Sequence, residues 1–217
     1  MLKKELIKKA EEFLRERFDD AVYLNLHKEE KAYRTEHSYR VANIGRMIAS
    51  GEGFDETEMT IACLLHDISY CEEFGEDGWK NHGRRSAEIV RPFLAELGLS
   101  KDRVNDICYG IAIHVDDKAD YESERTPFAL SVGDADNIDR FDVYRIHEVL
   151  EGDRFLEKSL EEKKEYVQKR LDRLKELKDM PMATETAGEM WKSRIAFYTE
   201  FYEKLCGQIN NSKSIIE

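Results

Sequence analysis

Several residues of this 217-residue chain have side chains suited to metal binding. The dipeptide His66-Asp67 places an imidazole, a good ligand for divalent transition metals, next to a carboxylate, which can bridge two ions. One such pair is weak evidence, because a single histidine in a core more often donates to a backbone carbonyl. Three more of the six histidines also fall at expected helix ends or on inward-facing helical positions, which favours metal chemistry: His37, His82 and His114.

Four segments carry these residues, in the order TEHSYRVANI, IACLLHDISY, NHGRRSAEIV and IAIHVDD, and a fifth, SVGDADNIDRFD, follows and carries Asp134. In order and local sequence they resemble the metal-binding motifs of the HD-domain phosphohydrolases, over about residues 30–150. The resemblance implies an all-α fold, the HD-domain helical bundle with additional C-terminal helices. It also implies six metal ligands: His37, His66, Asp67, His82, His114 and Asp134. His82 and His114 match the extra histidines of the binuclear members, and Asp67 is the bridging ligand. The implied cofactors are two divalent metal ions, with Mn, Fe, Zn, Co, Ni and Mg all left open.

The resemblance implies a metal-dependent phosphohydrolase that cleaves a phosphomonoester or phosphodiester, of a nucleotide or small metabolite, by a metal-activated hydroxide. An alternative from another reaction class is an HD-type diiron oxygenase acting on a small polyol or phosphonate, because the same ligands suit iron. A third reading, a non-catalytic interaction module, predicts broken ligands, whereas all six are intact. Cyclic dinucleotides are not favoured as substrates, because the GYP tripeptide of that branch is absent.

Three basic residues near His82 are candidates for contact with a phosphate. Arg84 and Arg85 lie at the start of an expected helix, where guanidinium groups and helix N-terminal amides can bind an anion together. A solvated surface position explains either arginine equally well. Lys80 is a further catalytic candidate with Asp67 and Arg84, although an ordinary surface lysine is slightly favoured. Asp116, two residues after His114, is expected either to orient that imidazole or to cap a loop.

Apolar residues recur at helical spacing along most of the chain. The expected helices cover residues 2–18, 35–50, 56–67, 82–98, 101–114, 127–136, 154–178 and 182–205. The helix over 56–67 is almost solidly apolar, so it should be buried and should carry the His66-Asp67 pair at its end. We expect one HD-type domain over 1–217, with a metal-binding core at about 30–150. A C-terminal helical flank at about 151–210 could form a separate subdomain.

The composition restricts the partners. The formal net charge is -12, which opposes binding to a nucleic-acid polymer or an anionic membrane through a broad basic face. The four cysteines lack a C-x-x-C pair, and no run of about 18 apolar residues occurs. A cytoplasmic protein with reduced thiols is expected. Its partner is expected to be a small-molecule phosphate ester or nucleotide, and a homodimer is left open.

Overall fold

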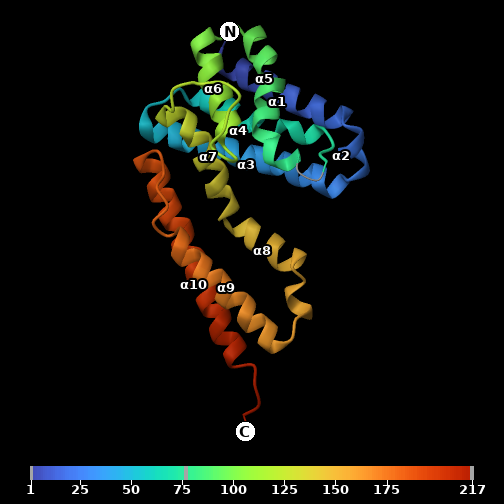
Figure 1. Ribbon diagram of the computed structural model, residues 1–217, viewed down its shortest axis with the longest axis vertical. Coiled ribbons are helices and arrows are strands. Elements are labelled where there is room, and N and C mark those ends of the chain that lie inside the picture. Colours follow the sequence, from blue (N-terminus) through green and yellow to red (C-terminus); the bar gives the residue numbers. More distant parts are fainter. Residues whose placement is uncertain (1, 76–77, 216–217) are drawn as a thin grey trace. The chain divides into compact units, whose positions relative to one another are not determined.

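The protein is all-α, as the sequence predicts (Figure 1). The computed structural model describes residues 2–75 and 78–215, and this part contains ten α-helices, three short 3-10 helices and no strand. None of the described helices is both long enough and apolar enough to cross a membrane. The described chain divides into two compact units. The N-terminal unit contains the residues up to Asp139 together with Ala183–Ala187, and the C-terminal unit contains Arg140–Met182 and the residues from Gly188 onward.

The described part of the N-terminal unit is built from seven α-helices and two 3-10 helices. In chain order these are α1(Lys3–Asp20), α2(Val22–Leu26), α3(Lys28–Glu52), α4(Glu56–Leu65), η1(Ile68–Cys71), η2(Gly78–Asn81), α5(His82–Glu96), α6(Lys101–Ile113) and α7(Pro127–Arg140). Helix α4 lies at the centre, against α1, α3 and α6. The carboxylate of Asp55 begins α4 by accepting hydrogen bonds from the backbone N–H groups of Thr57 and Glu58. Its apolar sequence is buried on all sides, which explains why its last turn can deliver polar residues into the interior.

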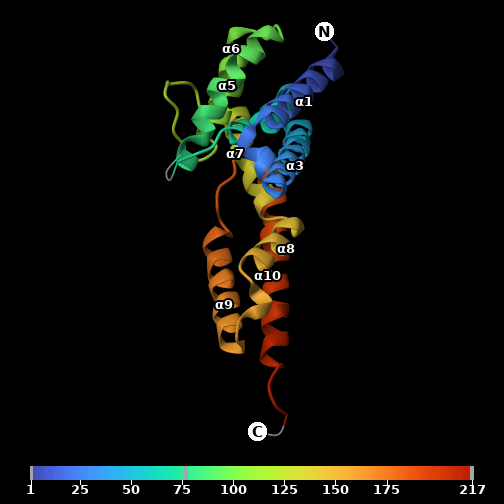
Figure 2. The same ribbon diagram turned by 90° about the vertical axis from the view of Figure 1, so that its right-hand side faces the viewer.

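The C-terminal unit is a small group of helices with its own core. It contains α8(Val143–Gly152), η3(Phe155–Glu157), α9(Leu160–Leu177) and most of α10(Glu185–Asn210). Helices α9 and α10 run side by side (Figure 2). Trp191 of α10 is buried, and its indole N–H donates to the carbonyl of Leu177 at the end of α9. The division between the units falls at Asp139, so α8 groups with the C-terminal helices rather than with a core that extends to about residue 150.

Gly110 marks a close approach between α6 and α7. A Cβ atom at this position would lie 2.7 Å from the carbonyl oxygen of Ala129 and 2.9 Å from Cγ2 of Val132. Because the first of these atoms is backbone, α7 would have to shift. We expect Gly110→Ala to lower the free energy of unfolding by about 1–3 kcal/mol, measured by urea denaturation.

Gly188 of α10 provides the matched control. Apart from the backbone of α10 itself and the two residues next to Gly188, no described atom lies within 4 Å of a Cβ built at this position. Gly188→Ala should therefore raise the free energy of unfolding by about 0.5–1 kcal/mol, because alanine costs less backbone entropy in a helix. A Gly110→Ala protein as stable as the wild type would contradict the tight packing of α6 on α7.

Candidate metal centre

His66 and Asp67 directly follow α4 and are buried. The His66 ring is 0% exposed, and its Nδ1 atom donates to the carbonyl oxygen of Cys63 at 2.7 Å. A carbonyl oxygen can only accept a hydrogen bond, so Nδ1 carries the proton of the neutral ring and Nε2 presents a lone pair. Within the described residues, Nε2 has no hydrogen-bond partner.

The rings of His82 and His114 are each oriented by a hydrogen bond to a nearby backbone carbonyl. His82 begins α5 and its Nδ1 atom donates to the carbonyl of Trp79, while His114 follows α6 and its Nδ1 atom donates to the carbonyl of Ile111 at 2.6 Å. In each case the acceptor lies three residues earlier. The two Nε2 atoms consequently face each other at 3.1 Å. Hydrogen bonds of this kind are the usual way in which a protein orients a metal-binding imidazole.

His37 is held by carboxylates rather than by a carbonyl. Its Nδ1 atom donates to Oδ2 of Asp139 at 2.7 Å, and Asp139 is itself held by Nε of Arg40 at 2.8 Å. The Nε2 atom of His37 lies 3.2 Å from Oδ1 of Asp136. The spacing of Asp136 and Asp139 on α7 places both on the side that faces α3.

Asp67 connects the four imidazoles. Its Oδ1 atom lies 3.1 Å from Nε2 of His82, 3.5 Å from Nε2 of His114 and 3.6 Å from Nε2 of His66, and its Oδ2 atom lies 3.6 Å from Nε2 of His37. Two overlapping sets of three residues have ligand atoms that all lie within 4.8 Å of one another: His37, His66 and Asp136, and His66, Asp67 and His114. The carboxylate of Asp67 therefore stands where a bridging ligand would be needed.

The structure corrects the assignment of Asp134. Its Oδ2 atom accepts a hydrogen bond from the backbone N–H of Ala183 at 2.8 Å, and Asp136 lies in the cluster instead. Residues two apart on a helix point in directions about 200° apart, so only one of them can face His37. The spacing from Asp136 to Asp139 puts two carboxylates on one face of α7, and this is a signal in the sequence that could have favoured Asp136 over Asp134. Burial raises the pKa of Asp134 to about 6.

The electrostatics of the cluster combine burial with close opposite charges. Burial alone would lower the pKa of His37, but its hydrogen bonds to Asp136 and Asp139 raise it to about 9. Burial lowers the pKa of His66 to about 4, so this ring is neutral. Burial would raise the pKa of Asp67, yet the surrounding imidazoles, His66 foremost, hold it well below its usual range. The His37 hydrogen bond likewise lowers the pKa of Asp136 against the effect of burial.

These side chains fit divalent metal ions. Lone pairs on imidazole nitrogens and carboxylate oxygens face one another at 3.1–3.9 Å, an arrangement that repels unless a proton or cation lies between them. Within the described residues, Nε2 of His66 and Oδ1 of Asp67 are buried without a hydrogen-bond partner, and each such group costs about 1–3 kcal/mol. A cation satisfies these atoms together. Imidazole with carboxylate suits Mn, Fe, Co, Ni and Zn.

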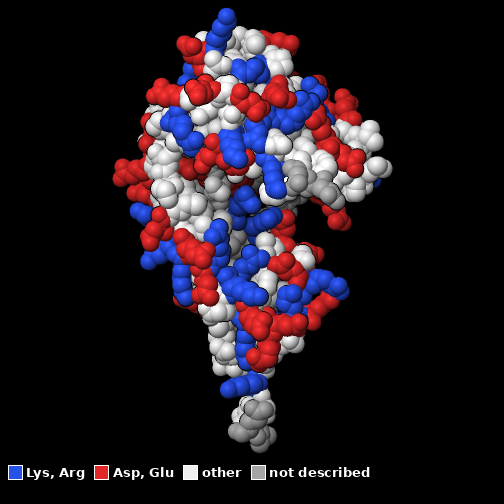
Figure 3. All heavy atoms as spheres, viewed as in Figure 1, with Lys and Arg blue, Asp and Glu red and all other residues white. Residues whose placement is uncertain are grey.

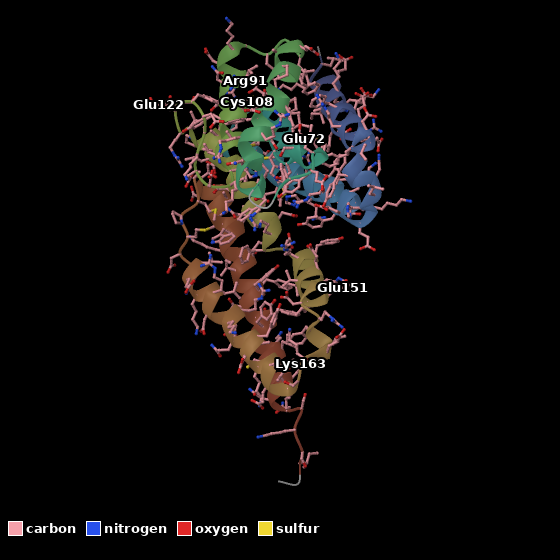
Figure 4. All side chains as sticks on the ribbon, turned by 45° about the vertical axis from the view of Figure 1, so that its right-hand side comes forward. Glu72, Arg91, Cys108, Glu122, Glu151 and Lys163 are labelled. Atoms are coloured by element: carbon pink, nitrogen blue, oxygen red, sulfur yellow. The ribbon has the colours of Figure 1, made fainter. Side chains whose placement is uncertain are left out.

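The three basic residues that the sequence suggests as substrate contacts, Lys80, Arg84 and Arg85, lie next to other side chains of the protein. Arg85 pairs with Glu72, labelled in Figure 4, at 2.7 Å and with Glu88 at 2.7 Å. Arg84 donates to both carboxylate oxygens of Asp116, at 2.9 and 3.2 Å. The ammonium of Lys80 lies 5.7 Å from the ring centroid of Trp79. The five other predicted ligands, His37, His66, Asp67, His82 and His114, come together, and their role in holding metal remains a prediction.

Arg34 is a site residue that the sequence interpretation missed. Its Nη1 atom lies 3.2 Å from Oδ2 of Asp67, and its guanidinium carbon lies 3.3 Å from the centroid of the Tyr70 ring. The side chain is 20% exposed, so it borders both the cluster and solvent. Arg34 precedes His37 by three residues, which puts both on one face of α3. That spacing is the signal that could have identified it.

Comparisons with known proteins agree with this geometry. The family model described as HD domain matches residues 34–141, which include every residue of the cluster from Arg34 to Asp139. The crystal structure of a predicted HD superfamily hydrolase from an uncultured Thermotogales bacterium has a similar fold, with a TM-score of 0.62 and 22% sequence identity over 93% of this chain and 91% of that chain. No curated protein matches the chain. By this match, and with its clustered histidines and aspartates on a helical fold, the chain contains an HD domain over residues 34–141.

Proposed function

We propose that this protein is a metal-dependent hydrolase, and specifically a phosphohydrolase that acts on a small phosphomonoester or phosphodiester such as a nucleotide. The observation that carries the proposal is the convergence of four imidazole Nε2 atoms on Asp67, within 3.1–3.6 Å of its two carboxylate oxygens. The solved relative is described as a predicted HD superfamily hydrolase, which agrees with hydrolysis.

The chain's own residues provide the two halves of a binuclear site. His37, His66 and Asp136 would hold one ion, and His82 and His114 would hold the other, with Asp67 shared between them. Bound divalent metals activate a water molecule at neutral pH and stabilise negative charge on phosphoryl oxygens. The local hydrogen bonds from each Nδ1 atom keep the Nε2 lone pairs directed at the ions, so little rearrangement is needed on metal binding.

The charge balance of the cluster favours an anionic substrate. Asp67, Asp136 and Asp139 carry three negative charges, while Arg34 and Arg40 carry two positive charges, and the imidazoles are neutral when they bind metal. Two divalent ions would therefore leave the centre positive. The outer surface differs, since basic and acidic side chains are intermixed on the face shown in Figure 3. A small phosphate ester that reaches the centre is thus a better match than an extended polyanion.

Arg34 is positioned to contribute a contact to the substrate. Its guanidinium stacks on Tyr70, lies beside Asp67 and is partly exposed. We expect Arg34→Gln to lower kcat/KM for the phosphate ester by about 10–100-fold, because a charge-assisted contact to the phosphoryl oxygens is lost. Metal content should stay at the wild-type level, measured by elemental analysis. Arg85→Gln, which removes an arginine paired with Glu72 and Glu88, is the matched comparison. A larger loss of activity in Arg85→Gln than in Arg34→Gln would contradict this role.

The proposed reaction is tested with metal analysis followed by a substrate panel. Protein purified without chelator or nickel is assayed for bound metals and then for phosphate release from nucleoside mono-, di- and triphosphates and from nitrophenyl mono- and diesters. Hydrolysis that requires metal and is absent in Asp67→Ala supports the proposal. Two bound irons together with oxygen consumption on small polyols or phosphonates, and no phosphate release, would favour the diiron oxygenase.

A further inference from the structure

The ends of α5 and α6 carry the two histidines of one metal position. His82 is the first residue of α5 and His114 follows the last residue of α6, and their Nε2 atoms are 3.1 Å apart. Each ring is oriented by a carbonyl of its own segment, Trp79 for His82 and Ile111 for His114. These two hydrogen bonds set the direction of each ring but do not hold one helix end against the other.

Arg84 connects the two segments. Its Nη1 atom donates to Oδ1 and Oδ2 of Asp116, at 2.9 and 3.2 Å, and to the carbonyl of Lys118 at 3.4 Å. Its Nη2 atom donates to Oδ1 of Asn81 and to the carbonyl of Lys80, the latter at 3.5 Å. Asp116 follows His114 by two residues, and Asn81 directly precedes His82. One guanidinium therefore bonds to the chain beside both histidines.

The backbones of the two helix ends are in direct contact at Gly83. A Cβ atom at this position would lie 2.8 Å from the carbonyl oxygen of Ala112 and 3.1 Å from Nδ1 of His114. The Arg84 side chain is only 16% exposed, so its ion pair with Asp116 is shielded and contributes more than a surface pair does. Close backbone packing and an ion pair in which Nη1 of Arg84 contacts both carboxylate oxygens of Asp116 thus act at the same place, between His82 and His114.

We propose that Arg84 is a positioning residue that holds His82 and His114 together and so sets the affinity of their metal position. This inference rests on the binuclear site of the proposed function. It also reassigns Arg84, whose location in the sequence suggests a contact with substrate. Because His37, His66 and Asp136 lie on or directly after α3, α4 and α7, away from the Arg84 contacts, the effect is selective for one of the two metals.

Cobalt titration of the full-length protein tests this selectivity. Metal-free wild type, Arg84→Met and Arg85→Met are titrated with Co²⁺, whose binding is followed by visible absorption, and bound metal is counted by elemental analysis. Wild type should bind two Co²⁺ ions. Arg84→Met should bind the second ion about 10–100-fold more weakly, with the first ion unchanged, because a group that orients ligands is lost. Arg85→Met changes the adjacent arginine, which pairs with Glu72 and Glu88, and this variant should titrate as wild type.

Asp116→Asn provides a second variant in case Arg84→Met does not fold, as judged by circular dichroism. It should weaken binding of the second Co²⁺ ion to the same extent. The double variant with Arg84→Met should bind that ion little more weakly than either single variant, because both changes remove the same interaction, the Arg84–Asp116 ion pair. An unchanged second affinity in both variants, an equal loss of both ions, or a wild type that binds one Co²⁺ ion would overturn the proposal. A wild type that binds two Co²⁺ ions but cleaves no phosphoester would overturn the proposed function and leave the role of Arg84 intact.

Discussion

Asp67→Ala should abolish metal binding and lower the rate of phosphoester hydrolysis by about 10³-fold or more, while the protein stays folded. The reason is geometric: Asp67 is the carboxylate that lies within 3.1–3.6 Å of all four imidazole Nε2 atoms. Its removal separates the two sets of ligands and takes away a negative charge that a cation needs. The fold should survive because α4, which leads into Asp67, is held by apolar packing along its whole length. Elemental analysis measures the loss of metal, phosphate release measures the loss of activity, and circular dichroism shows whether the fold is retained.

Asp67→Asn separates the charge of this residue from its volume. Asparagine keeps one oxygen ligand and nearly the same size, but it cannot bridge two ions as an anion does. We expect it to retain more metal than Asp67→Ala and to remain severely impaired in activity. Full metal content together with wild-type activity in either variant would show that Asp67 is not a bridging ligand.

Asp136→Asn should also strongly weaken metal binding. We expect the metal affinity of the position that Asp136 shares with His37 and His66 to fall by about 100-fold or more. The carboxylate of Asp136 lies 3.2 Å from Nε2 of His37 and 3.9 Å from Nε2 of His66. An amide in its place still contacts His37 but no longer offers an anionic ligand. Isothermal titration with Mn²⁺ measures the loss directly.

Asp134→Asn is the matched control, two residues away on the same helix. Its carboxylate accepts a hydrogen bond from the N–H of Ala183, and an asparagine oxygen can accept the same bond. This variant should bind Mn²⁺ as the wild type does. Should Asp134→Asn lose metal and Asp136→Asn retain it, the assignment drawn from the structure would be wrong and the one drawn from the motif would be right.

Hydrophobic periodicity was enough to predict eight of the ten described α-helices, but not α2 and α8. The unbroken apolar sequence of α4 predicts a buried helix, and a buried helix that ends in His66 and Asp67 must place polar groups inside the protein. The resemblance to the HD-domain motifs then indicated which histidines come together. The helix predictions succeed because hydrophobic periodicity is a local property of the sequence.

The remaining assignments depended on contacts between residues far apart in the chain. Asp134 and Asp136 are the same residue type on the same helix. The packing of α7 against α3 decides that Asp136, and not Asp134, faces His37. Arg84 has the charge and helix position of an anion-binding residue, yet Asp116, 32 residues later, accepts its hydrogen bonds. The sequence, through its periodicity and its resemblance to the HD-domain motifs, therefore determined the fold class and five of the residues that come together. The tertiary structure decided which aspartate completes the cluster and which arginine lies beside it, because helix rotation and side-chain partners are set by packing across the whole domain.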